Sequence, residues 1–151
     1  MNVNFDLLYN PKQFIQIRPD FYSQVSQYFE KKSGFIYLAV SKNNNLLKIG
    51  RTGKTPLARA ESLSGTGVLY DFEILFSLPV LNQFWAESSV HQKLKKYRVD
   101  KEFFAVNQQF AIEMMENIYN LEEHLLKRYF NIKELKNNYT DIGKCIKSYE
   151  C

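Results

Sequence analysis

Cysteine is scarce in this chain, and Cys145 and Cys151 are the only two present. They lie close together near the C-terminal end, so a disulfide between them would close only a small loop and could not stabilise a whole domain. A structural zinc ion needs four ligands, and this pair supplies at most two of them. We therefore expect two ordinary free thiols, as is usual in the reducing cytoplasm.

Long apolar runs are also missing. No stretch approaches the roughly 20 apolar residues that a membrane-spanning helix needs. Residues 1–20 do not show the charged-then-apolar layout of a secretion signal. We therefore expect a soluble cytoplasmic protein that has no membrane partner.

The charge shows no strong excess of one sign. The 20 basic and 16 acidic residues leave a net charge of +4, which suits a polyanionic partner but is common in proteins without one. The distribution is more informative, because residues 46–105 hold nine basic and six acidic residues and so carry +3 of that total. A nucleic-acid partner would therefore be expected to bind in this part of the chain.

The remaining composition is that of a globular protein. The chain has 151 residues, of which 45% are hydrophobic and 15% aromatic, enough for one domain with one core. Periodicity and turn residues predict helices and strands in the order that follows. They are a helix over Phe21–Lys32, strands over Gly34–Val40 and Asn45–Arg51, a helix over Pro56–Ser64, a strand over Tyr70–Val80, a helix over Gln83–Tyr97, an extended segment over Glu102–Val106 and a long helix over Gln108–Phe130.

These elements predict an α/β fold of the α+β type. A small three-stranded antiparallel sheet is flanked by helices, with an added N-terminal helix and a long C-terminal helix. We divide the chain into an N-terminal helical extension (residues 1–33), a core (34–106) and a C-terminal helical extension packed on the core (107–151).

The first two strands place a tyrosine near a lysine. A four-residue hairpin loop would pair Tyr37 with Lys48 across the strands, on one face of the sheet. An ammonium group beside a phenol favours the ionised phenol, so the pKa of Tyr37 would fall and its oxygen could act as a general base. The alternative is an ordinary aromatic–lysine pair on a half-exposed sheet face.

Short motifs in a fixed order extend this pattern. They are Gly34-Phe35-Ile36-Tyr37, Lys48-Ile49-Gly50, Arg59, Trp85-Ala86-Glu87-Ser88-Ser89-Val90-His91 and Glu102-Phe103-Phe104. In this order and spacing the segment Gly34–Val106 resembles the GIY-YIG nuclease family, particularly its phage-associated T5orf172 (Mug113-like) branch. Phe35 is inserted in the first motif, and Lys48 replaces the tyrosine of the second, a replacement familiar in that branch.

The resemblance implies a role for each matched residue. Tyr37 would take a proton from the attacking water, Arg59 would hold the scissile phosphate, and Glu87 would bind one divalent cation, Mg²⁺ or Mn²⁺. Lys48 would either lower the pKa of Tyr37 or contact phosphate. His91, one helical turn after Glu87, would touch phosphate, orient the metal ligand or be purely structural.

Other charged residues carry weaker expectations. Glu102 would join the site, or would cap or pair with Lys101 or Arg98. Candidates for nucleic-acid contact are Arg51, Lys54, Lys93, Lys95, Lys96 and Arg98. Solvated lysines at a helix C-terminus are the routine alternative for the last four, because they interact favourably with the helix dipole.

The function expected from these residues is metal-dependent endonuclease activity on nucleic acid, with DNA favoured. The alternative is a catalytically inactive nucleic-acid-binding or regulatory module of the same fold. The sequence is compatible with a protein partner or a homodimer. The resemblance to this branch suggests that the protein is associated with a phage or another mobile element. No separate recognition domain is visible, so the choice of strand or sequence cannot be read from the chain.

Overall fold

The computed structural model describes residues 3–42, 45–53 and 72–140. The α-helices among them are α1 (Tyr22–Lys32), α3 (Gln83–Lys93), α4 (Gln108–Leu126) and α5 (Ile132–Tyr139). The strands are β1 (Gly34–Ser41), β2 (Leu47–Thr52), β3 (Phe72–Val80), β4 (Arg98–Asp100) and β5 (Phe103–Phe104). Neighbouring strands pair antiparallel in the order β3-β1-β2-β5-β4.

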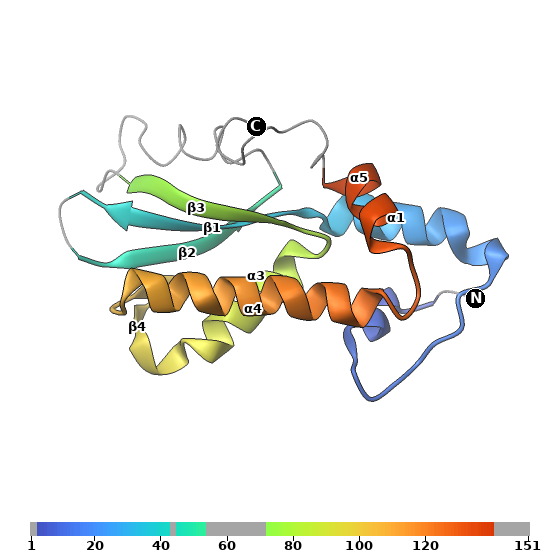
Figure 1. The fold of residues 1–151 in the computed structure, drawn as a ribbon, viewed down its shortest axis with the longest axis horizontal. Coiled ribbons are helices and arrows are strands. Elements are labelled where there is room, and N and C mark those ends of the chain that lie inside the picture. The colour runs from blue at the N-terminus through green and yellow to red at the C-terminus, as the bar shows by residue number, and fades with distance from the viewer. Residues whose placement is uncertain (1–2, 43–44, 54–71, 141–151) are drawn as a thin grey trace.

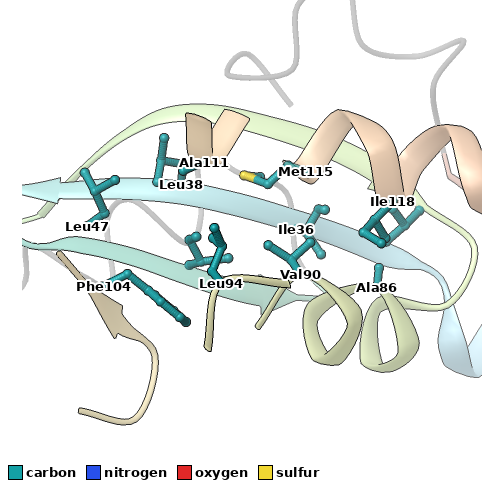
Figure 2. Close-up of a cluster of buried hydrophobic side chains, with 12 residues drawn as sticks. Ile36, Leu38, Leu47, Ala86, Val90, Leu94, Phe104, Ala111, Met115 and Ile118 are labelled. Atoms are coloured by element: carbon teal, nitrogen blue, oxygen red, sulfur yellow. The ribbon is translucent and has the colours of Figure 1, made fainter. Parts of the chain in front are cut away.

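Helices α3 and α4 cover one face of this sheet (Figure 1). The apolar stripe of α3, formed by Ala86, Val90 and Leu94, is fully buried against the strands. Figure 2 shows these side chains meeting those of β1, β2 and α4. Burying them supplies the main driving force for placing α3 beside β2, and this placement brings Glu87 and His91 of α3 against β2.

A second buried cluster joins the two ends of the described chain. It contains residues of the 3-10 helix η1 (Phe5–Tyr9), of α1, of the end of α4 and of α5. A further 3-10 helix, η2 (Pro19–Phe21), leads into α1. None of the described helices is both long enough and apolar enough to span a membrane.

The predicted fold class is confirmed, with shifts in detail. The expected three-stranded sheet is present as β3-β1-β2, and the short strands β5 and β4 extend it at the β2 edge. The helix predicted over Gln83–Tyr97 ends as an α-helix at Lys93 and continues as the 3-10 turn η3 (Lys95–Tyr97). The helix predicted over Pro56–Ser64 lies outside the described residues.

The predicted hairpin register is wrong by two residues. Strand β1 runs to Ser41 and β2 begins only at Leu47, so Lys48 pairs with Ala39, and Tyr37 pairs with Gly50. Because side chains alternate along a strand, a shift of two residues leaves each side chain on the same face. Lys48 and Tyr37 therefore still share a face, but they are diagonal neighbours and not directly opposite.

Candidate active site

Four consecutive residues of β2, Lys48 to Arg51, each contact one candidate residue that is distant in sequence. Gly50 contacts the ring of Tyr37. A Cβ at Gly50 would lie 2.5 Å from the Tyr37 hydroxyl and 2.6 Å from its Cζ, so the hydroxyl end of the ring reaches across β2. A glycine is needed here because any larger residue would collide with the ring. Tyr37 itself is fully buried.

Glu102 meets Lys48. Its carboxylate forms an ion pair with the Lys48 ammonium, and the Lys48 side chain is 9% exposed against 32% for Glu102. Glu102 lies in the tight connection between β4 and β5, next to Lys101, whose φ of 48° is in the left-handed region. The Lys48 ammonium also lies over the rings of Phe72 and Phe103, at 5.9 and 5.3 Å from their centroids.

His91 meets Ile49. Its Nε2 lies 2.7 Å from the Ile49 carbonyl oxygen, so Nε2 carries the hydrogen and donates. The Ile49 amide donates in turn to the Glu102 carbonyl at 3.0 Å. His91 thus fixes α3 against β2 through a backbone contact, and its ring lies 5.1 Å from that of Phe104.

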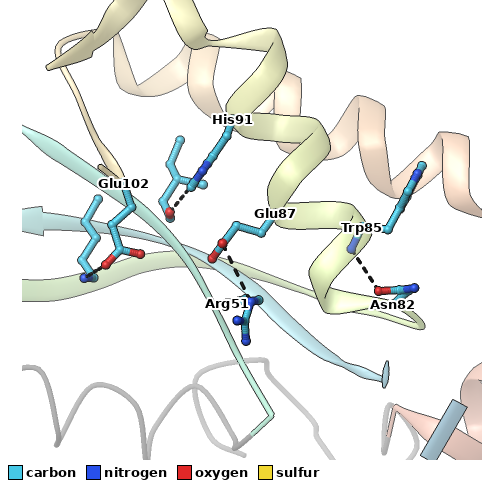
Figure 3. Close-up of polar contacts among 8 residues, drawn as sticks. Arg51, Asn82, Trp85, Glu87, His91 and Glu102 are labelled. Carbon is cyan, nitrogen blue, oxygen red and sulfur yellow. Dashed lines mark hydrogen bonds and ion pairs between the residues drawn. The ribbon is translucent and has the colours of Figure 1, made fainter. Parts of the chain in front are cut away.

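Glu87 meets Arg51. Its Oε1 lies 3.8 Å from the Arg51 Nε, and the two side chains are 21% and 40% exposed. Figure 3 shows Glu87 and His91 pointing from α3 toward β2, with Glu102 nearby. Partial burial raises the pKa of Glu87; the charges of His91, Arg51 and Lys48 oppose this rise, and that of Glu102 adds to it. The charged side chains of the site therefore interact with one another.

The lysine–glutamate pair gives a testable consequence. Lys48→Met leaves the Glu102 carboxylate without its partner and should lower the free energy of unfolding by about 1–2 kcal/mol. The double variant Lys48→Met/Glu102→Gln should lose less than the sum of the two single changes, because no charge is then left unpaired. Urea unfolding of the four proteins measures this coupling. Additive losses would show that the pair contributes nothing to stability.

The remaining predicted site residues fall in two groups. Arg59 and Lys54 lie outside the described residues. Lys93, Lys95, Lys96 and Arg98 are all exposed, at the end of α3 and in the segment that follows it. Lys96 lies over the Tyr97 ring at 5.2 Å and Arg98 over the Phe104 ring at 5.6 Å. Their exposure leaves them accessible to a phosphate backbone.

Two features near the site were not among the predicted site residues. Phe84 is exposed on the first turn of α3, with Lys32 and Arg51 against its ring. Its position three residues before Glu87, on a helix, was the signal that could have identified it. Glu122 is fully buried and holds the start of α3. Its spacing on α4, four residues after Ile118 and three before Leu125, places it on the apolar stripe of the helix and is the signal that could have marked it as buried.

Metal binding can be judged from the donor set. Within the described ranges, no three His, Cys, Asp or Glu side chains gather into a group that could hold a metal ion. Glu87 offers a partly exposed carboxylate beside β2, while the nearby Glu102 carboxylate is paired with Lys48. One carboxylate is a fitting ligand set for Mg²⁺, which keeps several waters and takes further oxygens from a bound phosphate.

Comparison with protein families gives one match. The model of the T5orf172 domain, a GIY-YIG-like nuclease domain family, matches residues 34–121, more than half of the chain. The chain belongs to the T5orf172 family. The searches of curated proteins and of solved structures found no match. The matched range begins at Gly34 on β1, includes every contact described above on β2, and reaches into α4.

Membership of the T5orf172 family suggests a nuclease-like protein, a nucleic-acid partner and a divalent cation. The individual roles of Tyr37, Glu87 and Arg59 are not part of that finding. The division of the chain at residues 33 and 106 also stays a prediction.

Proposed function

We propose that this T5orf172-family protein is a metal-dependent endonuclease that hydrolyses nucleic-acid phosphodiester bonds, with DNA favoured. One observation carries the proposal. Four successive residues of β2 each contact one of the residues that the motifs singled out, namely the tyrosine, the histidine and the two glutamates. Tyr37 packs on one face of the sheet, and α3, which carries Glu87 and His91, packs on the other, so β2 is the element that they share. These residues come from β1, α3 and the β4–β5 connection, so their contacts with β2 are a property of the fold and not of sequence proximity.

The chain's own groups divide the chemistry among them. Tyr37 takes a proton from the attacking water, and Arg59 donates two hydrogen bonds to the phosphate oxygens, which its planar guanidinium suits. Glu87 would hold Mg²⁺ or Mn²⁺, which supplies a Lewis acid at the phosphate. Because Tyr37 is fully buried, we expect substrate binding to open a path for water to its hydroxyl.

A second candidate is a module of the same fold that binds nucleic acid without cutting it. Two observations favour it: the full burial of Tyr37, and the engagement of Lys48 by Glu102, which offsets the charge that would act on the Tyr37 phenol. The partly buried carboxylate of Glu87 argues for the nuclease, since a negative charge near bound phosphate weakens binding unless a cation lies between them.

A cleavage assay separates the two candidates. Purified protein is incubated with end-labelled single-stranded DNA, double-stranded DNA and RNA, each with Mg²⁺, Mn²⁺ or a chelator. Cleavage that needs the metal supports the endonuclease. Salt-sensitive binding without cleavage under every condition supports the binding module and overturns the endonuclease proposal.

Tyr37→Phe tests the general base. The change removes one hydroxyl and keeps the ring over Gly50, so the fold and the binding of substrate should be retained. Cleavage should fall about a hundredfold, the lower end of what a general base contributes. Tyr22→Phe, at an exposed tyrosine on α1, is the matched control and should cut normally. Unchanged cleavage by Tyr37→Phe would remove this residue from the mechanism.

A further inference from the structure

Phe84 is an exposed aromatic side chain flanked by two cations. It is 42% exposed at the start of α3. The Lys32 Nζ lies 5.0 Å from the centroid of its ring, and the Arg51 Cζ lies 4.1 Å from the same point. An exposed ring with positive charges beside it is the arrangement that binds unpaired nucleobases, which stack on the ring while the cations meet the phosphates.

Its position ties Phe84 to the candidate active site. Glu87 follows three residues later on the same helix, so the two side chains project to neighbouring positions. Arg51 contacts both of them, with its guanidinium against the Phe84 ring and its Nε 3.8 Å from Glu87. If a phosphate binds beside Glu87, the base of the same nucleotide or of the next nucleotide can therefore reach the Phe84 ring.

An open hollow of about 340 Å³ lies beside the ring. Its lining includes Lys32, Phe84 and the exposed hydroxyl residue Ser88, which follows Glu87 directly. This volume is at the lower end of the range of small-ligand sites. The hollow lies beside the first turns of α3 and combines aromatic faces, a hydroxyl group, the Lys32 ammonium and the Asp6 carboxylate.

We propose that Phe84 is a stacking platform for one unpaired nucleobase next to the scissile phosphate, so that the substrate is single-stranded nucleic acid. This inference rests on the proposed nuclease function and names its substrate class. The entering base displaces Lys32 from the ring, because the Lys32 ammonium lies farther from the ring centroid than the Arg51 guanidinium carbon, at 5.0 against 4.1 Å. A paired base would first have to leave the duplex stack, at a cost of a few kcal/mol.

The test measures binding of non-cleavable oligonucleotides, in the presence of Mg²⁺, by fluorescence anisotropy. Labelled single-stranded DNA oligonucleotides each carry one abasic site, placed at a different position in each. For the wild type, one position should lower the affinity by about 5- to 150-fold, the equivalent of the 1–3 kcal/mol of one stacked base. In Phe84→Ala this position should become insensitive, while Phe84→Trp should keep the sensitivity.

Matched measurements make the result decisive. Phe14→Ala removes another exposed aromatic ring, 68% exposed and stacked on Tyr129, and should bind like the wild type. Wild-type binding to the matching duplex should be weaker than to the single strand. The same abasic scan on RNA shows whether the protein binds DNA, RNA or both in this way. A Phe84-dependent position in either polymer supports the proposal.

Four results would overturn it: no sensitive position, an equal loss for every oligonucleotide in Phe84→Ala, duplex binding as tight as single-strand binding, or no binding at all. Failure of the nuclease proposal is seen separately. Base-dependent binding without cleavage in Mg²⁺ upholds the platform and rejects the endonuclease. Cleavage without any dependence on Phe84 rejects only the platform.

Discussion

Glu87→Gln should reduce metal-dependent cleavage by at least about a thousandfold and leave the fold intact. The amide has the shape of the carboxylate but no charge, so it loses the attraction that holds a divalent cation. A bound metal contributes several kcal/mol of transition-state stabilisation, and each 1.4 kcal/mol corresponds to tenfold in rate. The Arg51 contact that the change also weakens spans 3.8 Å between partly exposed side chains, where an ion pair contributes little.

Two measurements accompany this comparison. A calorimetric titration with Mn²⁺, in the presence of a non-cleavable oligonucleotide, should show that Mn²⁺ binds to the wild type and binds more weakly to Glu87→Gln. Glu116→Gln, at an exposed glutamate on α4, is the control and should match the wild type in both assays. Full cleavage by Glu87→Gln would show that another group holds the cation, and the proposed division of roles would have to be changed.

The sequence was sufficient to predict the core because its apolar spacing has one good solution. The stripe predicted from helical spacing is Ala86, Val90, Leu94 and Tyr97; the first three side chains are fully buried, and Tyr97 packs partly buried against the core. Strand β4 was not predicted, since Arg98, Val99 and Asp100 are all exposed and show no alternation between buried and exposed positions. It pairs with β5 through the connection at Lys101 and Glu102, a contact that periodicity does not encode.

The hairpin register shows a second limit of prediction from the hydrophobic pattern. Pairing Leu38 with Leu47, as predicted, or with Ile49, as observed, puts the same side chains into the core. Hydrophobic pattern therefore excludes a slip of one residue but not of two. The contact of the Tyr37 ring with Gly50 exists in the observed register, where these two residues are directly opposite. A side chain at position 50 would conflict with the ring, which gives the glycine of this motif a physical reason.

The candidate site was predicted residue by residue from motif order, but its internal contacts were not. Glu102 was expected to join the site or to pair with Lys101 or Arg98, and its ion pair is with Lys48, 54 residues away in sequence. His91 was left between a structural and a catalytic role, and its bond to the Ile49 carbonyl supports a structural part. Such partners depend on how β2, α3 and the β4–β5 connection pack, which local patterns do not determine.

Glu122→Gln should destabilise the protein by about 2–3 kcal/mol near neutral pH, although Glu122 lies outside the candidate site. The Glu122 carboxylate is fully buried and accepts hydrogen bonds from the Leu81 amide at 2.8 Å and from the Asn82 amide and the Tyr9 hydroxyl at 2.9 Å. In a glutamine, the NH₂ group would face one of these donors. Neither the NH₂ group nor that donor would then have an acceptor. Asn82 is the N-cap of α3, so the change also loosens the start of the helix that carries Glu87.

The pH dependence gives this prediction a sign. Burial raises the pKa of Glu122 from 4.5 to about 7, against the opposing effect of its hydrogen bonds and of Lys136. Between these two values the folded protein keeps a proton that the unfolded chain has released. The contribution of Glu122 to the free energy of unfolding therefore falls as pH rises through this window, by up to about 1.4 kcal/mol per pH unit.

Urea unfolding of wild type, Glu122→Gln and Glu116→Gln at several pH values between 5 and 8 measures this slope. Glutamine does not titrate, so Glu122→Gln should lack the contribution, and the cost of the substitution should be largest at the acidic end. Glu116→Gln should follow the wild type throughout. A Glu122→Gln protein whose stability runs parallel to the wild type across this range would mean that Glu122 stays ionised in the fold, held in that state by its three hydrogen-bond donors.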